Sequence, residues 1–356
     1  MAVTTTPETT AIAEIIGRFP RRRLFQTPSP IQRMHRLEAD LGADVEIYMK
    51  REDLLRPMCG NKIRYLEFVL GAYDEEASDC LIHCGGQTSN YLAHLAIVGA
   101  AEGIPVHLVL LGEAPSEPNG NPLIEELLGA QMYYRPGKFG GSCSEHKAVL
   151  AGNLRKHGRR PYVIDYPFSN YSAVLGYLSA YCELREQIDS GEAPEFTHLF
   201  LCSGSNSYLG LRLGADLSGD GIPITAFPAS TWMETGLDHI APDLNTFAKM
   251  KVQEFGNWIG QDFLTRKMDL DEGFSDPGYG IPSKESLEAV RRVGRCEGVL
   301  LDPIYSGKAM AGLIDRVEKN QFEPGSRLLF FHSGGAINTF TYFREFSANR
   351  RQANDE

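Results

Sequence analysis

The chain has 356 residues, of which 42% are hydrophobic and 23% are charged, a balance that is ordinary for a globular protein. This length is enough for two domains that each bury a core. The formal net charge of −11 at pH 7 disfavours nucleic acid and anionic membrane surfaces as partners. No run of about 18 apolar residues occurs, so we expect no membrane-spanning segment.

The N-terminal segment and the cysteines bear on where the protein works. Segment 1–13 is rich in threonine and lacks the basic and apolar stretches of a secretory signal, so we interpret it as a frayed tail. The seven cysteines are an odd number at irregular spacing, and no second pair completes a zinc set with Cys80 and Cys84. Reduced, mostly buried thiols in a cytoplasmic protein are therefore expected.

Short apolar stretches alternate with helical patterns along the chain. The stretches expected to form strands are 44–50, 80–83, 106–111, 162–164, 198–202, 224–226 and 328–332. Helices are expected from about Asn61 onward and over 91–102, 122–128, 172–188 and 284–298, with Asn61, Asn121 and Ser283 as N-caps. This alternation is typical of a mostly parallel α/β sheet covered on both faces.

Three of the predicted strands end in turns of small residues that open helices. These turns are 84–90, 202–207 and 332–336. In an open parallel sheet ligands bind beyond the carboxyl ends of the strands, and such turns offer backbone N–H groups and hydroxyls to an anion. One such turn is a weak indication, because glycine often serves only the turn itself. Three of them, together with Gly60-Asn61-Lys62, predict a composite site.

Lys62 is the most informative residue of this site. It stands in the first turn of a predicted helix, where the partial positive charge of the helix N-terminus opposes an ammonium. Desolvation would lower its pKa further and make it a nucleophilic amine of the kind that forms Schiff bases. The plainer alternative is a solvated lysine at a helix start, and the other motifs of the chain favour the reactive amine.

Several motifs together resemble one family. They are Lys-Arg-Glu-Asp (50–53), Gly-Asn-Lys (60–62), Ser-Asn (89–90), Pro-Gly-Tyr-Gly-Ile-Pro (277–282), Leu-Asp-Pro-Ile-Tyr-Ser-Gly-Lys-Ala-Met-Ala-Gly-Leu-Ile-Asp (301–315) and His-Ser-Gly-Gly-Ala (332–336). From about Phe19 to Tyr342 the chain is similar to the D-cysteine desulfhydrase / 1-aminocyclopropane-1-carboxylate deaminase family, as a divergent member. These are pyridoxal phosphate (PLP) enzymes of fold type II.

The resemblance implies an architecture. The fold would be the α/β fold of the tryptophan synthase β type, with two open parallel-sheet domains and the cofactor in the cleft between them. Residues 1–62 and 172–356 would form the large PLP-binding domain, and residues 63–171 the small αβα domain. The resemblance also implies a homodimer.

The resemblance further implies roles for particular residues. Lys62 would be the Schiff-base lysine, and Ser89 would meet the substrate carboxylate or transfer a proton. Tyr279 and Tyr305 would face the substrate, one of them placed to move protons or polarise the leaving group. The other cofactor-binding residues would be Asn61, Asn90 at the ring oxygen, Ser203, Gly204, Ser205, Asn206 and Ser207 at the phosphate, Ser306 at the pyridine nitrogen, and Ser333 beside the ring.

The implied function is β-elimination and deamination of a small, D-configured or sulfur-containing amino acid, giving a keto acid and ammonia. PLP withdraws electrons, so that the Cα–H bond becomes acidic enough for Lys62 to remove the proton. A hydroxyl at the ring nitrogen, as Ser306 would supply, holds that nitrogen less firmly protonated than a carboxylate does. The milder electron sink favours β-elimination over transamination.

Two positions place the chain nearer the desulfhydrase branch. The ring-opening deaminases resemble Tyr-Glu-Gly-Lys and His-Leu-Gly-Gly where this chain has Tyr-Ser-Gly-Lys (305–308) and His-Ser-Gly-Gly (332–335). Ser306 and Ser333 thus replace a charge and a bulky apolar group. A neutral exchange of small residues is the alternative interpretation, because short motifs often mislead.

The chain also departs from the family pattern. Its phosphate loop, 203–208, is one residue shorter than Ser-Gly-Ser-Ala-Gly-Thr and lacks the Gly-Thr pair. Tyr65 stands where relatives carry a basic residue near the phosphate, a loss of about 1.5–3 kcal/mol for one charge-assisted hydrogen bond. Tyr91 replaces a His or Gln, and segment 167–171 makes the expected pocket wall bulkier. We therefore expect PLP to be kept but held differently, and the substrate to be an unusual one.

Two alternative functions stay open at this point. PLP-dependent β-replacement, or deamination of the 1-aminocyclopropane-1-carboxylate type, would use the same residues in a specialised biosynthetic pathway. Segment 167–171 is the support for replacement, whereas Ser306 and Ser333 disfavour ring opening. A non-catalytic amino-acid-binding or PLP-binding relative would explain the altered phosphate loop, but the retained Lys62 argues against it.

Three further residues are of types that often act as acid/base or phosphate-binding groups. His83 and His332 each end a predicted strand beside one of the small-residue turns, and we expect both to be hydrogen-bonded core histidines. Lys308, in Ser-Gly-Lys, resembles a phosphate-binding lysine, but the glycine spacing of a P-loop is absent.

Overall fold

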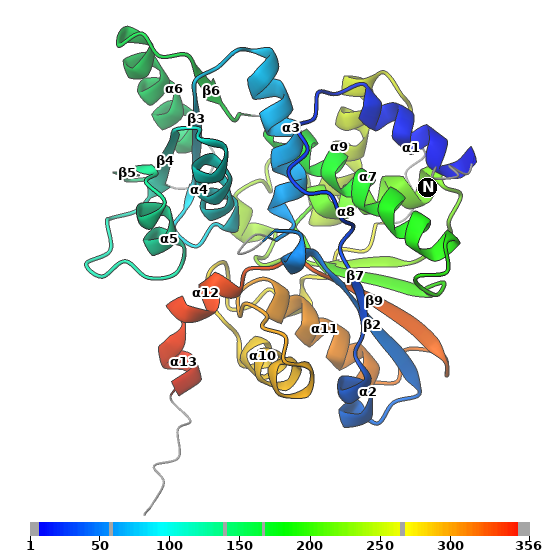
Figure 1. Ribbon diagram of the computed structural model, residues 1–356. Coiled ribbons are helices and arrows are strands. Elements are labelled where there is room, and N and C mark those ends of the chain that lie inside the picture. The colour runs from blue at the N-terminus through cyan, green and yellow to red at the C-terminus, as the bar shows by residue number, and fades with distance from the viewer. Residues whose placement is uncertain (1–6, 57–59, 138–140, 166–167, 264–267, 348–356) are drawn as a thin grey trace, which may run out of the picture.

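The computed structural model describes residues 7–56, 60–137, 141–165, 168–263 and 268–347. Within these ranges the strands form two sheets, one with the order β1-β2-β9-β7-β8 and one with the order β5-β4-β3-β6. All named pairs are parallel except β1–β2. Figure 1 shows the two sheets side by side, with α3 running between them.

The bounds of the strands follow the apolar stretches of the sequence. They are β1 (Ile31–Arg33), β2 (Val45–Arg51), β3 (Cys80–Gly86), β4 (Val106–Leu111), β5 (Gln131–Arg135), β6 (Pro161–Val163), β7 (His198–Cys202), β8 (Ile224–Phe227) and β9 (Ser326–His332). The seven strands expected from the sequence are confirmed in place, whereas β1 and β5 were not expected.

Helices follow most of the strands. They are α1 (Pro7–Gly17), α2 (His35–Leu41), α3 (Lys62–Glu75), α4 (Asn90–Glu102), α5 (Asn121–Leu127), α6 (Gly141–Lys156), α7 (Phe168–Asp189), α8 (Asn206–Leu217), α9 (Leu244–Ile259), α10 (Lys284–Glu297), α11 (Ser306–Glu318), α12 (Ala336–Thr341) and α13 (Phe343–Ser347). Short 3-10 turns are η1 (Glu52–Leu54), η2 (Met233–Thr235) and η3 (Glu272–Phe274).

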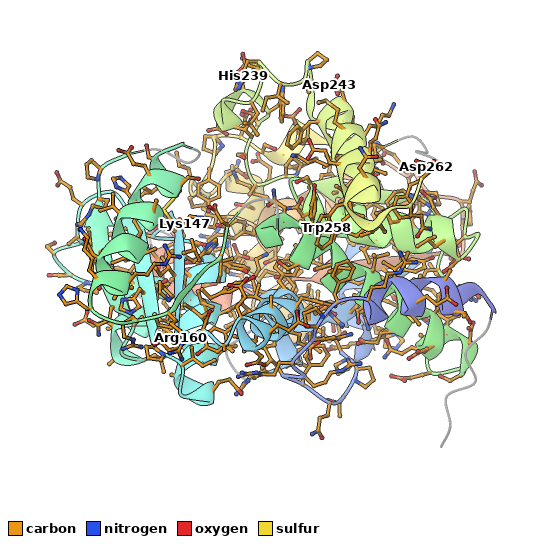
Figure 2. All side chains as sticks on the ribbon, turned by 90° about the horizontal axis from the view of Figure 1, so that it is seen from above. Lys147, Arg160, His239, Asp243, Trp258 and Asp262 are labelled. Carbon is orange, nitrogen blue, oxygen red and sulfur yellow. A yellow bond between two sulfur atoms is a disulfide. The ribbon has the colours of Figure 1, made fainter. Side chains whose placement is uncertain are left out.

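Some helix starts are set by capping side chains. The Ser283 hydroxyl accepts the backbone N–H of Ser286 in a reciprocal capping box, so this expected cap of α10 is confirmed. Asp243, labelled in Figure 2, caps α9 by accepting the N–H of Thr246 at 2.8 Å. The expected cap at Asn121 is wrong, because Gly120 holds the N-cap position of α5 with φ +60°.

The larger sheet is buried on both faces. Successive residues of a strand point to opposite faces, so Leu329 and Phe331 of β9 pack on one side and Leu328 and Phe330 on the other. Helices α1, α7, α8 and α9 contribute to the first core, and α2, α10 and α11 to the second (Figure 1). This double burial explains why β7 and β9 are continuous apolar runs rather than alternating ones.

A third core lies under the smaller sheet, formed by β3, β4, α3 and α4. The strands of this sheet come from residues 80–163, and those of the larger sheet from residues 31–51 and 198–332. The domain boundaries at 62/63 and 171/172 stay a prediction. None of the helices in the described ranges has the length and apolarity to cross a membrane.

Two expectations about the N-terminus and the cysteines are corrected. Residues 7–13 are not a frayed tail but belong to α1, whose Ile12 and Ile15 are buried in the first core; residues 1–6 lie outside the described ranges. Cys84 at the end of β3 and Cys143 in α6 form a disulfide with a Cα–Cα distance of 5.6 Å. The four other described cysteines are free thiols.

Candidate active site

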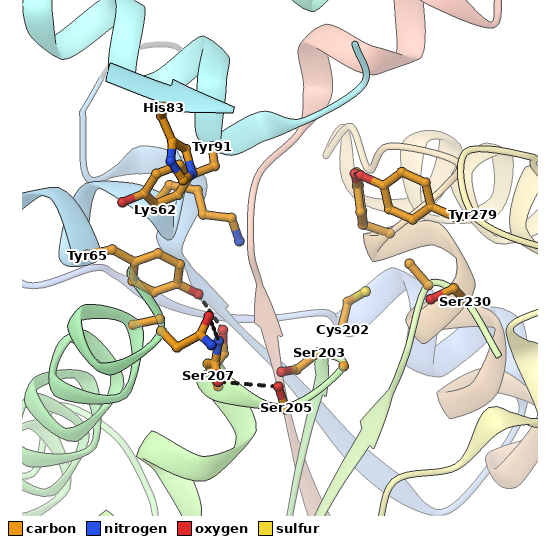
Figure 3. A pocket seen from close by; sticks show the side chains of 16 residues that line it. Lys62, Tyr65, His83, Tyr91, Cys202, Ser203, Ser205, Ser207, Ser230 and Tyr279 are labelled. Atoms are coloured by element: carbon orange, nitrogen blue, oxygen red, sulfur yellow. Dashed lines mark hydrogen bonds between the residues drawn. The ribbon is translucent and has the colours of Figure 1, made fainter. Parts of the chain in front are cut away.

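Lys62 is the first residue of α3 and lines two cavities, of about 440 Å³ and 210 Å³. Figure 3 shows its amine reaching into the larger one. The loop before it is held by the Asn61 N–H, which donates to the Ser333 carbonyl at 3.0 Å. A Cβ on Gly60 would come 2.2 Å from that carbonyl oxygen, so only glycine lets the loop lie there.

The surroundings of Lys62 make its amine a better nucleophile. The side chain is partly buried, and burial lowers its pKa to about 8 against the opposing fields of Cys202 and Asp302. The amine lies 4.9 Å from the ring centroid of Tyr65. An appreciable fraction of the amine is therefore unprotonated near neutral pH.

The larger cavity ends at the start of α8. All five residues expected at the phosphate, 203–207, line it, and they form the turn from β7 into this helix. Asn206 Nδ2 donates to Asn170 Oδ1 at 3.0 Å, and Ser203 Oγ accepts the Tyr208 N–H at 3.2 Å. A 12-residue helix presents partial positive charge and free N–H groups at this end, so the turn is suited to an anion.

Tyr65 supplies a neutral hydroxyl beside this turn. Its Oη and the Ser207 Oγ are hydrogen-bonded, as Figure 3 shows, and Asn61 Nδ2 donates to Tyr65 Oη at 3.2 Å and to Tyr177 Oη at 3.0 Å. Burial raises the pKa of Tyr65, so the hydroxyl is neutral at physiological pH. Where relatives were expected to carry a cation, this chain thus has a hydrogen-bonded pair of hydroxyls.

The smaller cavity brings together most of the expected substrate-side residues. Its lining includes Asn61, Lys62, Ser89, Asn90, Tyr279, Tyr305 and Ser333. Tyr279 Oη and Tyr305 Oη are 2.5 Å apart, and Tyr305 Oη donates to the Thr88 carbonyl at 3.3 Å. Burial raises the pKa of both tyrosines, so the two hydroxyls are proton donors rather than anions at neutral pH.

Ser306 does not line either cavity. Its hydroxyl is fully buried and donates to Asp302 Oδ2 at 2.7 Å, while Asp302 also accepts the backbone N–H groups of Ile304, Tyr305 and Ser306. Burial raises the pKa of Asp302, and these hydrogen bonds oppose that rise. The contact of Ser306 with a pyridine nitrogen stays a prediction, and Asp302 is a buried carboxyl near the site that the sequence reasoning missed.

The larger cavity has further walls that were not expected. They come from Cys202, Ala229 and Ser230, which stand at or just after the end of a strand, and from His83 in the middle of β3. His83 Nδ1 is 3.1 Å from the Ile164 carbonyl oxygen, and burial lowers the pKa of His83 to about 3, so its ring is neutral. The strand-end position of Cys202, Ala229 and Ser230 was the signal available in the sequence.

His332 is a hydrogen-bonded core residue, as expected. Its Nε2 donates to the Leu300 carbonyl at 3.2 Å, and its Nδ1 accepts the Gly334 N–H at 3.4 Å. Its side chain is fully buried, and burial lowers its pKa. The imidazole therefore fixes the turn that carries Ser333 rather than reaching the cavities.

Of the altered segment 167–171, the structure describes the side chains of Asn170 and Tyr171. Asn170 lines the larger cavity, but Tyr171 is buried in the first core, 4.7 Å from the ring of Trp258 and 5.5 Å from the ring of Phe255. The expectation of a more aromatic wall is therefore wrong for Tyr171. Tyr65 and Tyr91 do line the cavity; Pro167 and the side chains of 168 and 169 lie outside the described residues.

The residues present fit PLP. An amine of lowered pKa would take the aldehyde, and the α8 turn would take the phosphate. A Cβ at Gly335 would come 2.7 Å from Asp302 Oδ2 and 2.8 Å from Asn90 Nδ2, so glycine keeps these polar groups close to the turn after Ser333. These features define the class as α/β enzymes of fold type II, which hold PLP through a lysine between two parallel sheets.

Comparison with known proteins defines the family. The sequence model described as pyridoxal-phosphate dependent enzyme matches residues 22–334. The chain belongs to this family, in the group of D-cysteine desulfhydrases and 1-aminocyclopropane-1-carboxylate deaminases, and PLP is its cofactor.

Individual relatives match over most of their length. The D-cysteine desulfhydrase of Serratia proteamaculans is 34% identical over 336 residues, which are 92% of this chain and 97% of that protein. The 1-aminocyclopropane-1-carboxylate deaminase of Burkholderia multivorans is 32% identical over 334 residues, 90% of this chain and 95% of that protein. A solved structure of an ACC deaminase homologue is 28% identical with a TM-score of 0.81, covering 97% of this chain and 99% of that one.

Proposed function

We propose that the protein is a PLP-dependent lyase that eliminates a β-substituent from a small amino acid and releases a keto acid and ammonia. The observation that carries the proposal is the position of the Lys62 amine, which lines both cavities. One cavity ends in the anion-binding turn of α8, and the other is lined by hydroxyl and amide groups. Bound PLP withdraws electrons from Cα of the amino acid attached to it.

Lys62 is the base in this proposal. Its amine would hold the cofactor in the resting enzyme, and from the wall of the smaller cavity it would accept the proton from Cα of the substrate. Its pKa of about 8 lies close to physiological pH, where a group both accepts and returns a proton efficiently.

Ser89 and the tyrosine pair serve the other end of the substrate. Ser89 is at the N-cap of α4, so its hydroxyl and the free N–H groups of this helix would bind the carboxylate. The hydroxyls of Tyr279 and Tyr305 are neutral and linked to each other at 2.5 Å. They would donate a proton to the departing β-substituent, and the 210 Å³ of the cavity suits a small amino acid.

The desulfhydrase type is favoured over the ring-opening type. Ser306 and Ser333 take the places of a glutamate and a leucine of the deaminase pattern. Tyr171, part of the only segment that supported β-replacement, packs in the core and so lends that alternative nothing. D-Cysteine and 1-aminocyclopropane-1-carboxylate, which the relatives' names specify, are the first substrates to assay.

The decisive experiment measures both the visible absorption of bound PLP and the reaction products. Purified protein should be yellow, and Lys62→Ala should lose the visible band and all turnover while its far-UV circular dichroism is unchanged. With D-cysteine, the wild type should give keto acid, ammonia and sulfide in equal amounts. Lys319→Ala, an exposed lysine paired with Asp315, is the matched control and should behave as wild type. A colourless wild type that stays inert with added PLP contradicts the proposal.

We propose further that the protein acts as a homodimer in the cytoplasm. The resemblance to its family supports the dimer, and the four free thiols among the six described cysteines support the location. Light scattering should give twice the mass of one chain. A monomeric mass at micromolar concentration would contradict the dimer, and recovery of the protein in a secreted fraction would contradict the location.

A further inference from the structure

Lys308 is a buried lysine whose charge meets no carboxylate within ion-pair distance in the described ranges. It is the third residue of α11, its side chain is fully buried, and its Nζ donates to three backbone carbonyls. The distances are 2.6 Å to Ser275, 2.7 Å to Gly278 and 3.0 Å to Ala229. All three N–H groups of the ammonium are therefore used by carbonyl oxygens.

This arrangement differs from the usual burial of a lysine. Buried charges are normally paired with an opposite charge, because leaving water is otherwise unfavourable. Here neutral carbonyl dipoles from three positions of the backbone converge on one cation, as they do around alkali ions in carbonyl-lined sites. The side chain consequently holds backbone rather than another side chain.

The three carbonyls belong to segments that form the cavity walls. Ala229 precedes Ser230, which lines the larger cavity, and Gly278 precedes Tyr279, which lines both. Lys308 itself follows Tyr305 by three residues, and the hydroxyls of Tyr305 and Tyr279 are 2.5 Å apart. The start of α11 is thus linked to residues 278–279 twice. The Lys308 ammonium makes one link outside the cavities, and the tyrosine pair makes the other inside them.

We propose that Lys308 is a positioning residue that acts as a monovalent cation tethered to α11, and that it fixes the backbone carrying Ser230 and Tyr279. Removing the side chain to Cβ leaves a hole lined by three carbonyl oxygens. A free ammonium or potassium ion fills that hole and restores the wall. The role of the wall in turnover rests on the proposed lyase function; the binding of a free cation does not.

Two other roles are excluded by the geometry. A phosphate-binding lysine needs free N–H groups at the cofactor cavity, but Lys308 has none left and lines neither cavity. A purely apolar packing role would leave the ammonium without hydrogen bonds, whereas here every donor is matched. Gly278 has φ +133°, and a Cβ there would come 2.1 Å from Glu234 Oε1, so only glycine fits at this point of the wall.

The first test needs no activity. Thermal unfolding of Lys308→Ala is followed in chloride salts of ammonium, potassium, lithium and tetramethylammonium at equal ionic strength. We expect saturable stabilisation of this variant by ammonium and potassium, beyond any response of wild type and of Lys319→Ala. Crystals of Lys308→Ala grown in rubidium chloride should show anomalous density within reach of the Ser275, Gly278 and Ala229 carbonyls. Equal salt responses in all three proteins, with no ion in the crystal, overturn the proposal.

The second test uses the holoenzyme. Lys308→Ala should keep the visible band of PLP on Lys62 while kcat falls by between about 10-fold and 100-fold, the range for a wall displaced by about 1 Å. Ammonium or potassium should restore kcat, and lithium should not. The positioning role is overturned if Lys308→Ala loses the visible band of PLP together with turnover, or if its kcat equals that of wild type.

Lys308→Met has a side chain of similar length but no charge, so it separates the contribution of the positive charge from that of filling the space. It should lose kcat like Lys308→Ala but gain nothing from added ions, because its side chain fills the hole. If neither variant folds in ammonium or potassium salts, an exchangeable cation does not replace the ammonium and the proposal fails. If wild type itself lacks lyase turnover, the proposed function fails, while the unfolding and crystal results still decide the cation site.

Discussion

Asn338 Nδ2 lies 2.8 Å from Asn90 Oδ1 and 3.1 Å from the backbone carbonyl of Thr88. The Thr88 carbonyl can only accept a hydrogen bond, so the NH₂ group of Asn338 must face it and also faces Asn90. Asn90 then presents its oxygen to Asn338, and Asn121 Nδ2 donates to the same oxygen at 3.2 Å. The NH₂ group of Asn90 is left for the cavity, where it can donate to the ring oxygen of PLP.

Asn338→Asp should disturb this orientation. A carboxylate would place an acceptor against the Thr88 carbonyl and Asn90 Oδ1, so the Asn90 amide would turn and present its oxygen to the cavity. We expect the affinity for PLP to fall by about 5-fold to 10-fold, as for one lost hydrogen bond of about 1 kcal/mol or more. Absorbance titration of the apoprotein measures it, and Asn320→Asp, the same change at an exposed residue, should have no effect. Unchanged affinity in Asn338→Asp would mean that Asn90 is not oriented by Asn338.

Tyr65→Phe removes the hydroxyl that stands where a cation was expected. Ser207 would lose its partner beside the α8 turn, and Asn61 Nδ2 would lose one acceptor. The affinity for PLP should fall by about 5-fold, whereas the affinity for pyridoxal without phosphate should be unchanged, because in the proposed site only the phosphate would contact this turn. Tyr133→Phe, which removes a hydroxyl 3.1 Å from His107 in the small sheet, is the control and should alter neither value. An equal loss for both ligands would assign Tyr65 to packing alone.

The layout of the sheets was predictable, because it depends on local patterns. The apolar runs of β7 and β9 indicate strands buried on both faces, and the small residues after them indicate turns. β1 and β5 were missed because they are short and largely half-exposed, so they carry little apolar signal. Residues 7–13 were interpreted as a tail because the threonines of this region weaken the apolar pattern of Ile12 and Ile15, the two residues that anchor α1 in the core.

The cavity lining was predictable only where a residue's place in a local pattern puts it at a strand or helix end. Lys62 follows from its place after a glycine loop, and 203–207 from their place between a strand and a helix. Asn121 was taken for a helix cap because its partner, Asn90, is 31 residues away in sequence. The carbonyls around Lys308 come from residues that no side-chain pattern marks, so only the folded chain brings them together.

The lowered pKa of Lys62 predicts how cofactor capture depends on pH. The unprotonated amine attacks the aldehyde, so the rate constant for PLP binding to apoprotein should rise about tenfold per pH unit below pH 8 and level off above it. Stopped-flow absorbance measures this. A profile that keeps rising past pH 8 and levels off only near pH 10.5, the ordinary value, would show that the amine is solvated.

The same shift has a consequence for stability. For a base, a lower pKa in the folded state destabilises the fold fully below pH 8, and the effect disappears above pH 10.5. Lys62→Met apoprotein should therefore be more stable than wild-type apoprotein at pH 7, by up to about 3 kcal/mol, with the difference shrinking at pH 10. Urea unfolding at both pH values checks it, and a variant less stable than wild type at pH 7 would contradict it.

Glu183 should set the acid stability of the helix that carries Lys62. Glu183 Oε1 is 2.8 Å from Arg64 Nη2 in α3 and 2.7 Å from Lys50 Nζ, and both cations are fully buried. Burial opposes ionisation of Glu183, but the two cations outweigh it and lower its pKa to about 2. For an acid this contribution is present above pH 4.5, the ordinary value, and is lost as the pH falls toward 2.

Glu183→Gln leaves buried charge uncompensated and should lower the free energy of unfolding at pH 7 by about 3–5 kcal/mol. Glu195→Gln, which breaks an exposed pair with Arg185, should change it by less than about 1 kcal/mol. Denaturant unfolding between pH 2 and pH 7 should show the gap between Glu183→Gln and wild type closing as the pH falls below about 4.5; a gap that does not depend on pH would mean that this carboxylate is not stabilised by its two cations.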